Sequence, residues 1–340
     1  MQHSRFRQEL SRARPPLSAQ DLMVTGVTRS MTAGRAWRRT SHGHYVPSAA
    51  ELTPAQRIVE SSVHLPPSGA VAGWAAAYVC GVDWLDGINL NGAFEAVPLC
   101  VGPEVRRRST TRVSYVRDHL QGNEVTPRHG LQVTSPLRTA FDTARWTPSL
   151  SDCVVALDAV THFGLVDLAS LCTYVAQRRK WAGLRQLRAA LPLVEASVRS
   201  PWESRLRMVY VLEAGLPRPY VNQPVFDTYG RFVAIPDLLD QEAGLAVEYD
   251  GSGHRERAQH NRDNVREEAM EDVGLIVVRA DSYDMRHRRA ELLERLLAAR
   301  RRGLSRVRTR DRWTLQPPSW AIDPYAGLSD EDKDALFGQS

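Results

Sequence analysis

Three carboxylates interrupt two apolar segments of one short stretch, IPDLLDQEAGLAVEYDGSGH, residues 235–254. Asp237 precedes the apolar pair LL, Glu248 and Asp250 close the run LAVEYD, and His254 follows four residues later. A strand that is buried on both faces ordinarily carries Val, Ile or Leu throughout, because an isolated buried charge is costly. We therefore expect the fold to place these acids where solvent, a cation or a hydrogen-bond donor stabilises their charge.

Strand geometry predicts that the three acids meet on one face. Residues two apart on a strand share a face, so Glu248 and Asp250 point the same way. With a turn at residues 241–244 centred between 242 and 243, Asp237 lies almost opposite Glu248, and such neighbours are separated by about 5 Å at Cβ. Three carboxylates this close require a cation or a raised pKa. Oxygen ligands of this kind suit Mg²⁺ or Mn²⁺.

The sequence around these acids predicts the order helix, three strands, helix, strand, helix. The first helix, SPWESRLRMVYVLEAG, begins at Ser200 with Glu203 in a capping-box position, and Gly215 ends it. PVFDTYGRFVAIPDLLD predicts a hairpin, LAVEYDG a third strand, and LIVVRA a short buried strand after a polar helix. Strands in a meander followed by a helical crossover favour a mixed sheet with helices on both faces.

This order and these residues resemble the very-short-patch-repair-like (Vsr-like) endonuclease domain of the PD-(D/E)XK nuclease superfamily. The resemblance covers residues 200–300 and rests on Pro236–Asp237, Glu248–Tyr249–Asp250, Gly251, His254, Asp263, Arg266 and the strand LIVVRA. It implies a restriction-endonuclease-like fold. The family's usual lysine is replaced here by Asp250.

The resemblance implies metal-assisted hydrolysis of a phosphodiester. Asp237, Glu248 and Asp250 would hold Mg²⁺ or Mn²⁺, and His254 would be the general base or orient the water. Tyr249 would face the other side of the sheet and pack there. Glu203 would either hold a metal-bound water or only cap its helix. Asp263 and Arg266 would support the site, or form a surface ion pair worth well under ~1 kcal/mol.

Residues 17–47 predict a helix, a turn, a second helix and a hairpin. Ser18 and Thr28 are suited to cap the helices AQDLMVT and RSMTAGRAW, and WRRTSHGHYVP supplies two strands joined at His42–Gly43. In a winged helix-turn-helix the second helix enters the major groove. The DNA-contacting candidates are Arg29, Ser30, Thr32, Arg35, Arg38 and Arg39. The alternative is a small helical cap on a larger domain.

The same segment resembles the winged-helix domain of AbiEi-type antitoxins from type IV toxin–antitoxin systems. VTSPLRTAFDTAR, residues 133–145, looks like the segment that follows in relatives of that family. The resemblance implies DNA binding at the front of the chain and makes a cognate toxin a candidate partner.

The chain of 340 residues is therefore expected to be a multi-domain α/β protein. We expect a winged helix over 1–50, an α+β middle region with a helical connector over 51–195, the nuclease-like domain over 196–302, and a tail over 303–340. The four cysteines are scattered without a CxxC pair, and the longest apolar run, 69–82, is too short to span a bilayer. These features, and an N-terminus without a signal peptide, predict a cytoplasmic protein with no membrane partner.

Two functions are consistent with the sequence. The first is a metal-dependent DNA endonuclease positioned by an N-terminal winged helix. The second is a non-catalytic DNA-binding regulator or antitoxin that retains an inactive nuclease fold. The net charge of +5 is modest, but arginine clusters at residues 35–39, 106–108 and 300–312 while lysine is nearly absent. Arginine binds phosphate oxygens in pairs, although a solvated surface would also use it.

Overall fold

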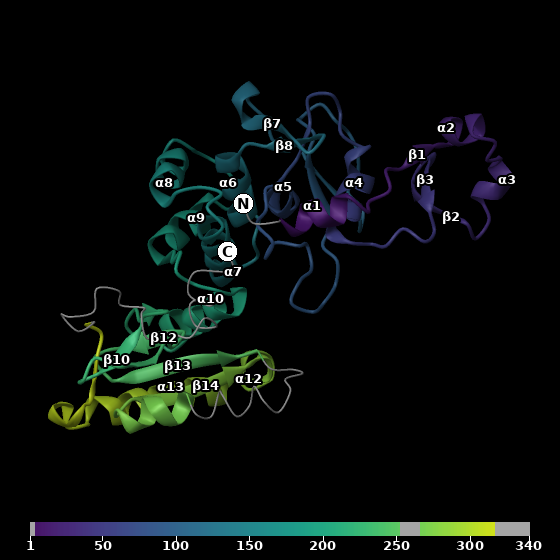
Figure 1. Cartoon of the computed structure of the whole chain (residues 1–340). Helices are drawn as coiled ribbons and strands as arrows, with labels where there is room; N and C mark the ends of the chain where they lie inside the picture. Colours follow the sequence, from purple (N-terminus) through teal and green to yellow (C-terminus); the bar gives the residue numbers. More distant parts are fainter. Residues whose placement is uncertain (1–3, 252–265, 317–340) are drawn as a thin grey trace. The chain divides into compact units, whose positions relative to one another are not determined.

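The computed structural model describes residues 4–251 and 266–316 (Figure 1). They form a mixed α/β protein with several sheets, as expected. The chain divides into two compact units, Met1–Val194 and Glu195–Ser340. No helix of the described ranges is both long and apolar enough to cross a bilayer.

The first unit begins with a small three-stranded sheet and short helices. Its elements are α1 (Arg5–Leu10), β1 (Leu17–Ser18), α2 (Ala19–Val24), α3 (Arg29–Thr32), β2 (Trp37–Ser41) and β3 (His44–Pro47). The strands lie in the order β1-β3-β2 and are antiparallel. The predicted caps are confirmed, because the Ser18 and Thr28 hydroxyls accept N–H bonds from the first turns of α2 and α3.

The second helix is shorter than predicted. It was expected to run to Trp37 but ends at Thr32, after one turn. Trp37 pairs with Pro47 in the β2–β3 hairpin, as the predicted strands of WRRTSHGHYVP required. The strand pairing therefore extends the backbone where local sequence favoured a continued helix, so α3 offers only one turn to a partner.

A five-stranded mixed sheet forms the centre of the first unit, in the order β6-β5-β4-β8-β7. Its elements are α4 (Pro54–Ser62), β4 (Ala70–Val71), α5 (Gly73–Val79), β5 (Val97–Cys100), β6 (Val113–Val116), β7 (Val125–Arg128) and β8 (Leu131–Thr134). The helices α6 (Pro136–Arg145), α7 (Leu150–His162), α8 (Leu168–Ala176) and α9 (Leu184–Ala190) follow. Residues 150–195 are mostly helical, which confirms the helical connector expected at the end of the 51–195 region.

The second unit contains a four-stranded mixed sheet in the order β14-β13-β12-β9. Its elements are α10 (Pro201–Met208), β9 (Tyr220–Val221), β10 (Val225–Asp227), β11 (Phe232–Ala234), β12 (Leu238–Asp240), β13 (Leu245–Asp250), β14 (Ile276–Asp281), α12 (Ser282–His287), α13 (Arg289–Leu304) and β15 (Trp313–Thr314). Residues 266–272 are also helical. β13 runs antiparallel to β12 and parallel to β14, which confirms the expected mixed sheet.

The predicted hairpin does not stay in this sheet. β10 and β11 pair with each other as expected, but they form a separate sheet with β15, from the expected tail. The strand expected to run from residue 231 to 240 is broken at residues 235–237, so Asp237 lies in a bend immediately before β12. Pro236 has no N–H to donate to a strand ladder, which explains the break.

β13 is the central strand of the candidate site. Its first four residues, Leu245–Glu248, are buried on both faces. Both α10 and α13 contact it, and they lie on either side of it in Figure 1. Glu248 and Asp250 therefore project from the interior of the layered unit at the carboxyl end of β13.

Candidate active site

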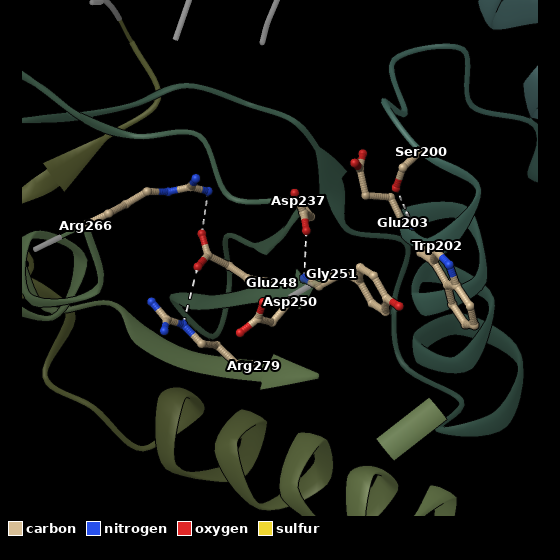
Figure 2. A pocket seen from close by; sticks show the side chains of 10 residues that line it. Ser200, Trp202, Glu203, Asp237, Glu248, Asp250, Gly251, Arg266 and Arg279 are labelled. Carbon is tan, nitrogen blue, oxygen red and sulfur yellow. Dashed lines mark hydrogen bonds and ion pairs between the residues drawn. The ribbon is translucent and has the colours of Figure 1, made fainter. Parts of the chain in front are cut away.

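A cavity of about 460 Å³ lies at the carboxyl end of β13 (Figure 2). It is lined by Ser200, Trp202, Glu203, Asp237, Glu248, Tyr249, Asp250, Gly251, Arg266 and Arg279. Four of these residues are carboxylic acids and two are arginines. The structure thus brings together the predicted acids Glu203, Asp237, Glu248 and Asp250.

The predicted alignment of Asp237 with Glu248 is confirmed by the strand register. Leu238 pairs with Val247 across β12 and β13, so the preceding residue, Asp237, comes opposite Glu248. The Tyr249 backbone N–H donates a hydrogen bond to Asp237 Oδ2 at 2.7 Å. The Asp237 side chain thus takes the place of a backbone acceptor just beyond the β12–β13 pairing, and the bond holds its carboxylate at the cavity.

The Asp237 carboxylate is strongly perturbed by its surroundings. It is 9% exposed. Burial, followed by the charges of Glu203 and Glu248, raises its pKa to about 7, although the Tyr249 N–H and Arg199 act in the opposite direction. Arg199 Nη2 lies 3.6 Å from Asp237 Oδ1. The site therefore favours a proton or another cation at Asp237.

Ser200 caps α10 as predicted, but Glu203 does not complete the predicted capping box. Ser200 caps α10 by accepting the Glu203 N–H at 3.1 Å, but the Glu203 carboxylate accepts the N–H of Arg199 rather than that of Ser200. Asn222 Nδ2 donates to Glu203 Oε2 at 2.9 Å. Glu203 is thus held at the start of α10 while lining the cavity.

Glu248 lies between two arginines (Figure 2). Arg266 Nη2 is 2.5 Å from Glu248 Oε1, and Arg279 Nε is 3.8 Å from Oε2. Arg279 is the register partner of Glu248 on the parallel strand β14 and also pairs with Glu267 at 3.0 Å. Arg266 further donates to the Ile235 carbonyl at 2.7 Å. Arg266 therefore supports Glu248 directly, whereas its predicted helix partner Asp263 lies outside the described residues.

Asp250 lines the same cavity as Glu248, as the two-residue period predicted. Its register partner on β14 is Asp281, which also caps α12 by accepting the Asp284 N–H. An acid thus faces another acid where the family that the sequence resembles carries lysine.

Tyr249 lies between Glu248 and Asp250 on β13 and packs against α10. Its ring stacks on Trp202, with centroids 5.1 Å apart and planes 4° apart, and both residues line the cavity. Trp202 is itself flanked by Arg205 and Arg286, whose guanidinium carbons lie 5.5 and 5.3 Å from its ring. Tyr249 therefore packs, as predicted, and α10 supplies its aromatic partner.

The predicted metal ligands are not assembled as a closed group. Within residues 4–251 and 266–316, no three Asp, Glu, His or Cys side chains are placed so that they could hold one metal ion. Glu248 is directed toward its two arginines. His254 lies outside the described residues, so the metal set and the general base stay predictions.

Sequence reasoning missed Trp202, Arg199, Asn222 and Arg279 as parts of this site. Arg279 carried a signal, because it ends the strand LIVVRA, where an arginine interrupts an apolar run. The other three lie on elements whose approach to β13 depends on the tertiary fold.

The predicted DNA-contacting residues at the front of the chain have different environments. Arg29, Ser30, Arg35 and Arg39 are exposed. Thr32 is buried, and its hydroxyl donates to the Arg29 carbonyl. Arg38 forms a two-point ion pair with Glu60 of α4, at 2.9 and 2.6 Å.

Comparisons of the chain with family models, curated proteins and solved structures find no match. The function therefore has to be inferred from the residues of the site.

Proposed function

We propose that the second unit hydrolyses phosphodiester bonds of DNA with Mg²⁺ or Mn²⁺ as cofactor. The observation that supports this most is the convergence of Glu203, Asp237, Glu248 and Asp250 on one cavity, with the buried Asp237 favouring a cation. The order of the PD, EYD and G-x-x-H elements, which resembles the Vsr-like nuclease domains, agrees with this chemistry.

The chemical type of the donors suits a hard divalent cation, although within the described residues no three of them are gathered around one point. Carboxylate oxygens are preferred ligands of Mg²⁺ and Mn²⁺, and the cavity offers four carboxylic acids. Asp237, Glu248 and Asp250 would hold the ion, with Glu203 beside it. A cation bound there would polarise the phosphate and lower the pKa of the attacking water.

The chain's own residues would position the substrate and move the proton. Arg266 and Arg279 would bind non-bridging oxygens of the phosphate in exchange for part of their contact with Glu248. His254 would accept a proton from water as its oxygen bonds to phosphorus. The bond from phosphorus to the leaving sugar oxygen then breaks, and that oxygen takes a proton from solvent.

The front of the first unit would bring the nuclease to duplex DNA. The hairpin β2–β3 and the exposed Arg29, Ser30, Arg35 and Arg39 would contact DNA in the manner of a winged helix. Arg38 would act through its ion pair with Glu60, and the buried Thr32 would support α3.

One specific observation favours a second candidate, a DNA-binding regulator or antitoxin without catalysis. Glu248 is already neutralised by Arg266 and Arg279, and Asp250 replaces the usual lysine. A nuclease fold that has lost its metal would tolerate both features. In that case a cognate toxin would be a further candidate partner.

A cleavage assay separates the two candidates. Purified full-length protein would be incubated with supercoiled plasmid and with mismatched duplexes, in Mg²⁺, Mn²⁺ or EDTA. We expect metal-dependent cleavage that Asp237→Asn and Glu248→Gln each reduce at least about 100-fold, equivalent to about 2.7 kcal/mol of transition-state stabilisation. Glu271→Gln, at an exposed position on the helix of residues 266–272, is the matched control and should cleave like wild type.

Two outcomes would reject the nuclease. Equal cleavage by wild type and both site variants would indicate a contaminating enzyme. DNA binding without turnover in any metal, together with no Mn²⁺ binding by calorimetry, would favour the regulator.

A further inference from the structure

Two arginine-rich segments contain no acidic residue. Residues 22–50 carry Arg29, Arg35, Arg38 and Arg39, and residues 105–117 carry Arg106, Arg107, Arg108, Arg112 and Arg117, with no Asp or Glu in either segment. The whole chain has a formal net charge of +5, so these nine arginines leave the remaining residues with a sum of −4. The two segments together therefore carry more positive charge than the chain has in excess.

The tertiary structure places the two segments side by side. Arg112 Nη1 donates to the Arg39 carbonyl on β2 at 3.4 Å. Arg107 Nη1 donates to the carbonyl of His64, just after α4, at 2.9 Å. Burial lowers the pKa of His64, and the charges of Arg107 and His44 lower it further, which places β3 near the same point. A single basic surface thus runs from the β2–β3 hairpin to residues 105–117. These residues form a loop that leads into β6 and ends at Arg117, and they are called the 105–117 loop below.

The loop has its own internal supports. Arg117 Nε donates to the Val105 carbonyl at 3.1 Å, and its Nη2 donates to the Arg107 carbonyl at 3.0 Å. Within the described residues, Arg106 and Arg108 make no hydrogen bond or ion pair, and both are exposed. The backbone of the loop is therefore held while these two guanidinium groups face solvent.

The surface is suited to an electrostatic partner. None of the large exposed apolar side chains falls within residues 33–50 or 104–117. Those nearby in the same unit are Leu17, Met23, Val24, Met31, Leu52 and Val63. A stable protein partner would ordinarily bury apolar anchors at the centre of its interface. Closely spaced arginines without such anchors are typical of contacts to a phosphate backbone.

We propose that the β2–β3 hairpin and the 105–117 loop form one binding surface for the phosphate backbone of duplex nucleic acid. It extends the contact proposed for the hairpin onto the middle of the first unit and adds Arg106, Arg107, Arg108, Arg112 and Arg117 to it. The inference rests on the proposed nucleic-acid partner but not on hydrolysis. Because α3 is a single turn, this surface provides most of the contact, and binding depends weakly on base sequence.

The test is the salt dependence of binding to a fluorescent duplex in EDTA, measured by anisotropy. The slope of log K against log salt is negative, and each lost phosphate contact reduces its magnitude by about 0.9. We expect Arg106→Ala with Arg108→Ala to reduce the magnitude by about 1.8, and adding Arg39→Ala to reduce it by about 2.7. The control is Arg128→Ala, Arg179→Ala and Arg185→Ala together, which removes three exposed charges of the same unit; Arg128 lies on β7, at the sheet edge opposite β6. This control should keep the wild-type slope.

Wild-type slope and affinity in the triple variant, with an unchanged melting temperature, would overturn the proposal. So would equal losses in the control, or binding of polyglutamate as tight as that of the duplex, which would indicate an acidic protein partner. Duplex DNA and duplex RNA are tested in parallel and should both show the slope change. If the slope changes but no DNA is cleaved, the proposed surface is supported and the proposed nuclease activity is rejected. If DNA is cleaved but the slope does not change, the nuclease is supported and the surface is rejected.

Discussion

Glu248 and Arg279 stand side by side on the parallel strands β13 and β14, with Arg279 Nε 3.8 Å from Glu248 Oε2. Arg266 approaches the same carboxylate from the other side. Asp250 and Asp281 form the next but one pair of the register. The positively charged side chains of the site are therefore Arg279 on β14 and Arg266 on the helix of residues 266–272. The position two residues after Glu248, where the resembled family carries lysine, is Asp250.

Removing Arg279 should move metal binding and catalysis in opposite directions. Arg279→Ala withdraws a positive charge from beside Glu248, so we expect Mn²⁺ to bind several-fold more tightly, by about 1 kcal/mol. Cleavage should fall, because the arginine would no longer bind the phosphate. Calorimetry with Mn²⁺ and single-turnover kinetics measure the two effects. Arg301→Ala, at an exposed position on α13, should change neither. Parallel losses of metal binding and cleavage would contradict the assigned role.

Asp237 should make the metal-free protein less stable as pH rises. Burial, then Glu203 and Glu248, raise its folded-state pKa to about 7, above its ordinary value near 4. The stability associated with its proton is fully present below about pH 4 and is lost as pH rises through 7, by at most about 4 kcal/mol. Urea unfolding of the full chain in EDTA from pH 4 to 8 measures this loss, and Asp237→Asn should remove most of it.

Mn²⁺ provides the complementary measurement. At pH 8 the ion should restore the stability of wild type but not that of Asp237→Asn, since the variant lacks the carboxylate. The exposed-site variant Glu271→Gln should follow wild type throughout. A pH profile of Asp237→Asn that is superimposable on wild type would show that Asp237 titrates normally.

Asp142 should be among the residues whose loss destabilises the first unit most. It is fully buried between Arg138 and Arg145, with Nε–Oδ distances of 2.7 and 2.8 Å. Asp142→Asn removes the fully buried carboxylate that both arginines share and leaves them only Asp118 and Glu124. About 3 kcal/mol, the lower end of the range for breaking a buried pair, is expected. Asp118→Asn, at a more exposed acid of the same cluster, should be milder. Thermal unfolding followed by circular dichroism compares the variants, and similar losses for both would contradict the ranking.

Arg38 and Glu60 should act as one unit in DNA binding. Their ion pair connects β2 to α4, with Arg38 22% and Glu60 8% exposed. Breaking it should cost about 3 kcal/mol, the lower part of the range for buried pairs. We expect Arg38→Ala and Glu60→Gln to weaken duplex binding to a similar degree by releasing the hairpin. If Arg38 contacts phosphate directly, Glu60→Gln would leave binding unchanged or strengthen it, and anisotropy distinguishes the two results.

Several local features followed from the sequence alone. The caps at Ser18, Thr28 and Ser200 depend on side chains that reach only three residues along the chain, so their pattern is visible without a fold. The alignment of Asp237 with Glu248 also followed, because the centre of a tight turn sets the register of its two strands.

Other features were decided by contacts between distant parts of the chain. β15 joins the β10–β11 pair, and Glu248 meets arginines 18 and 31 residues further on. Likewise, Arg112 reaches Arg39 across 73 residues. A sequence shows which charges need partners, but packing decides which partners arrive, because each of these contacts depends on how whole elements are placed.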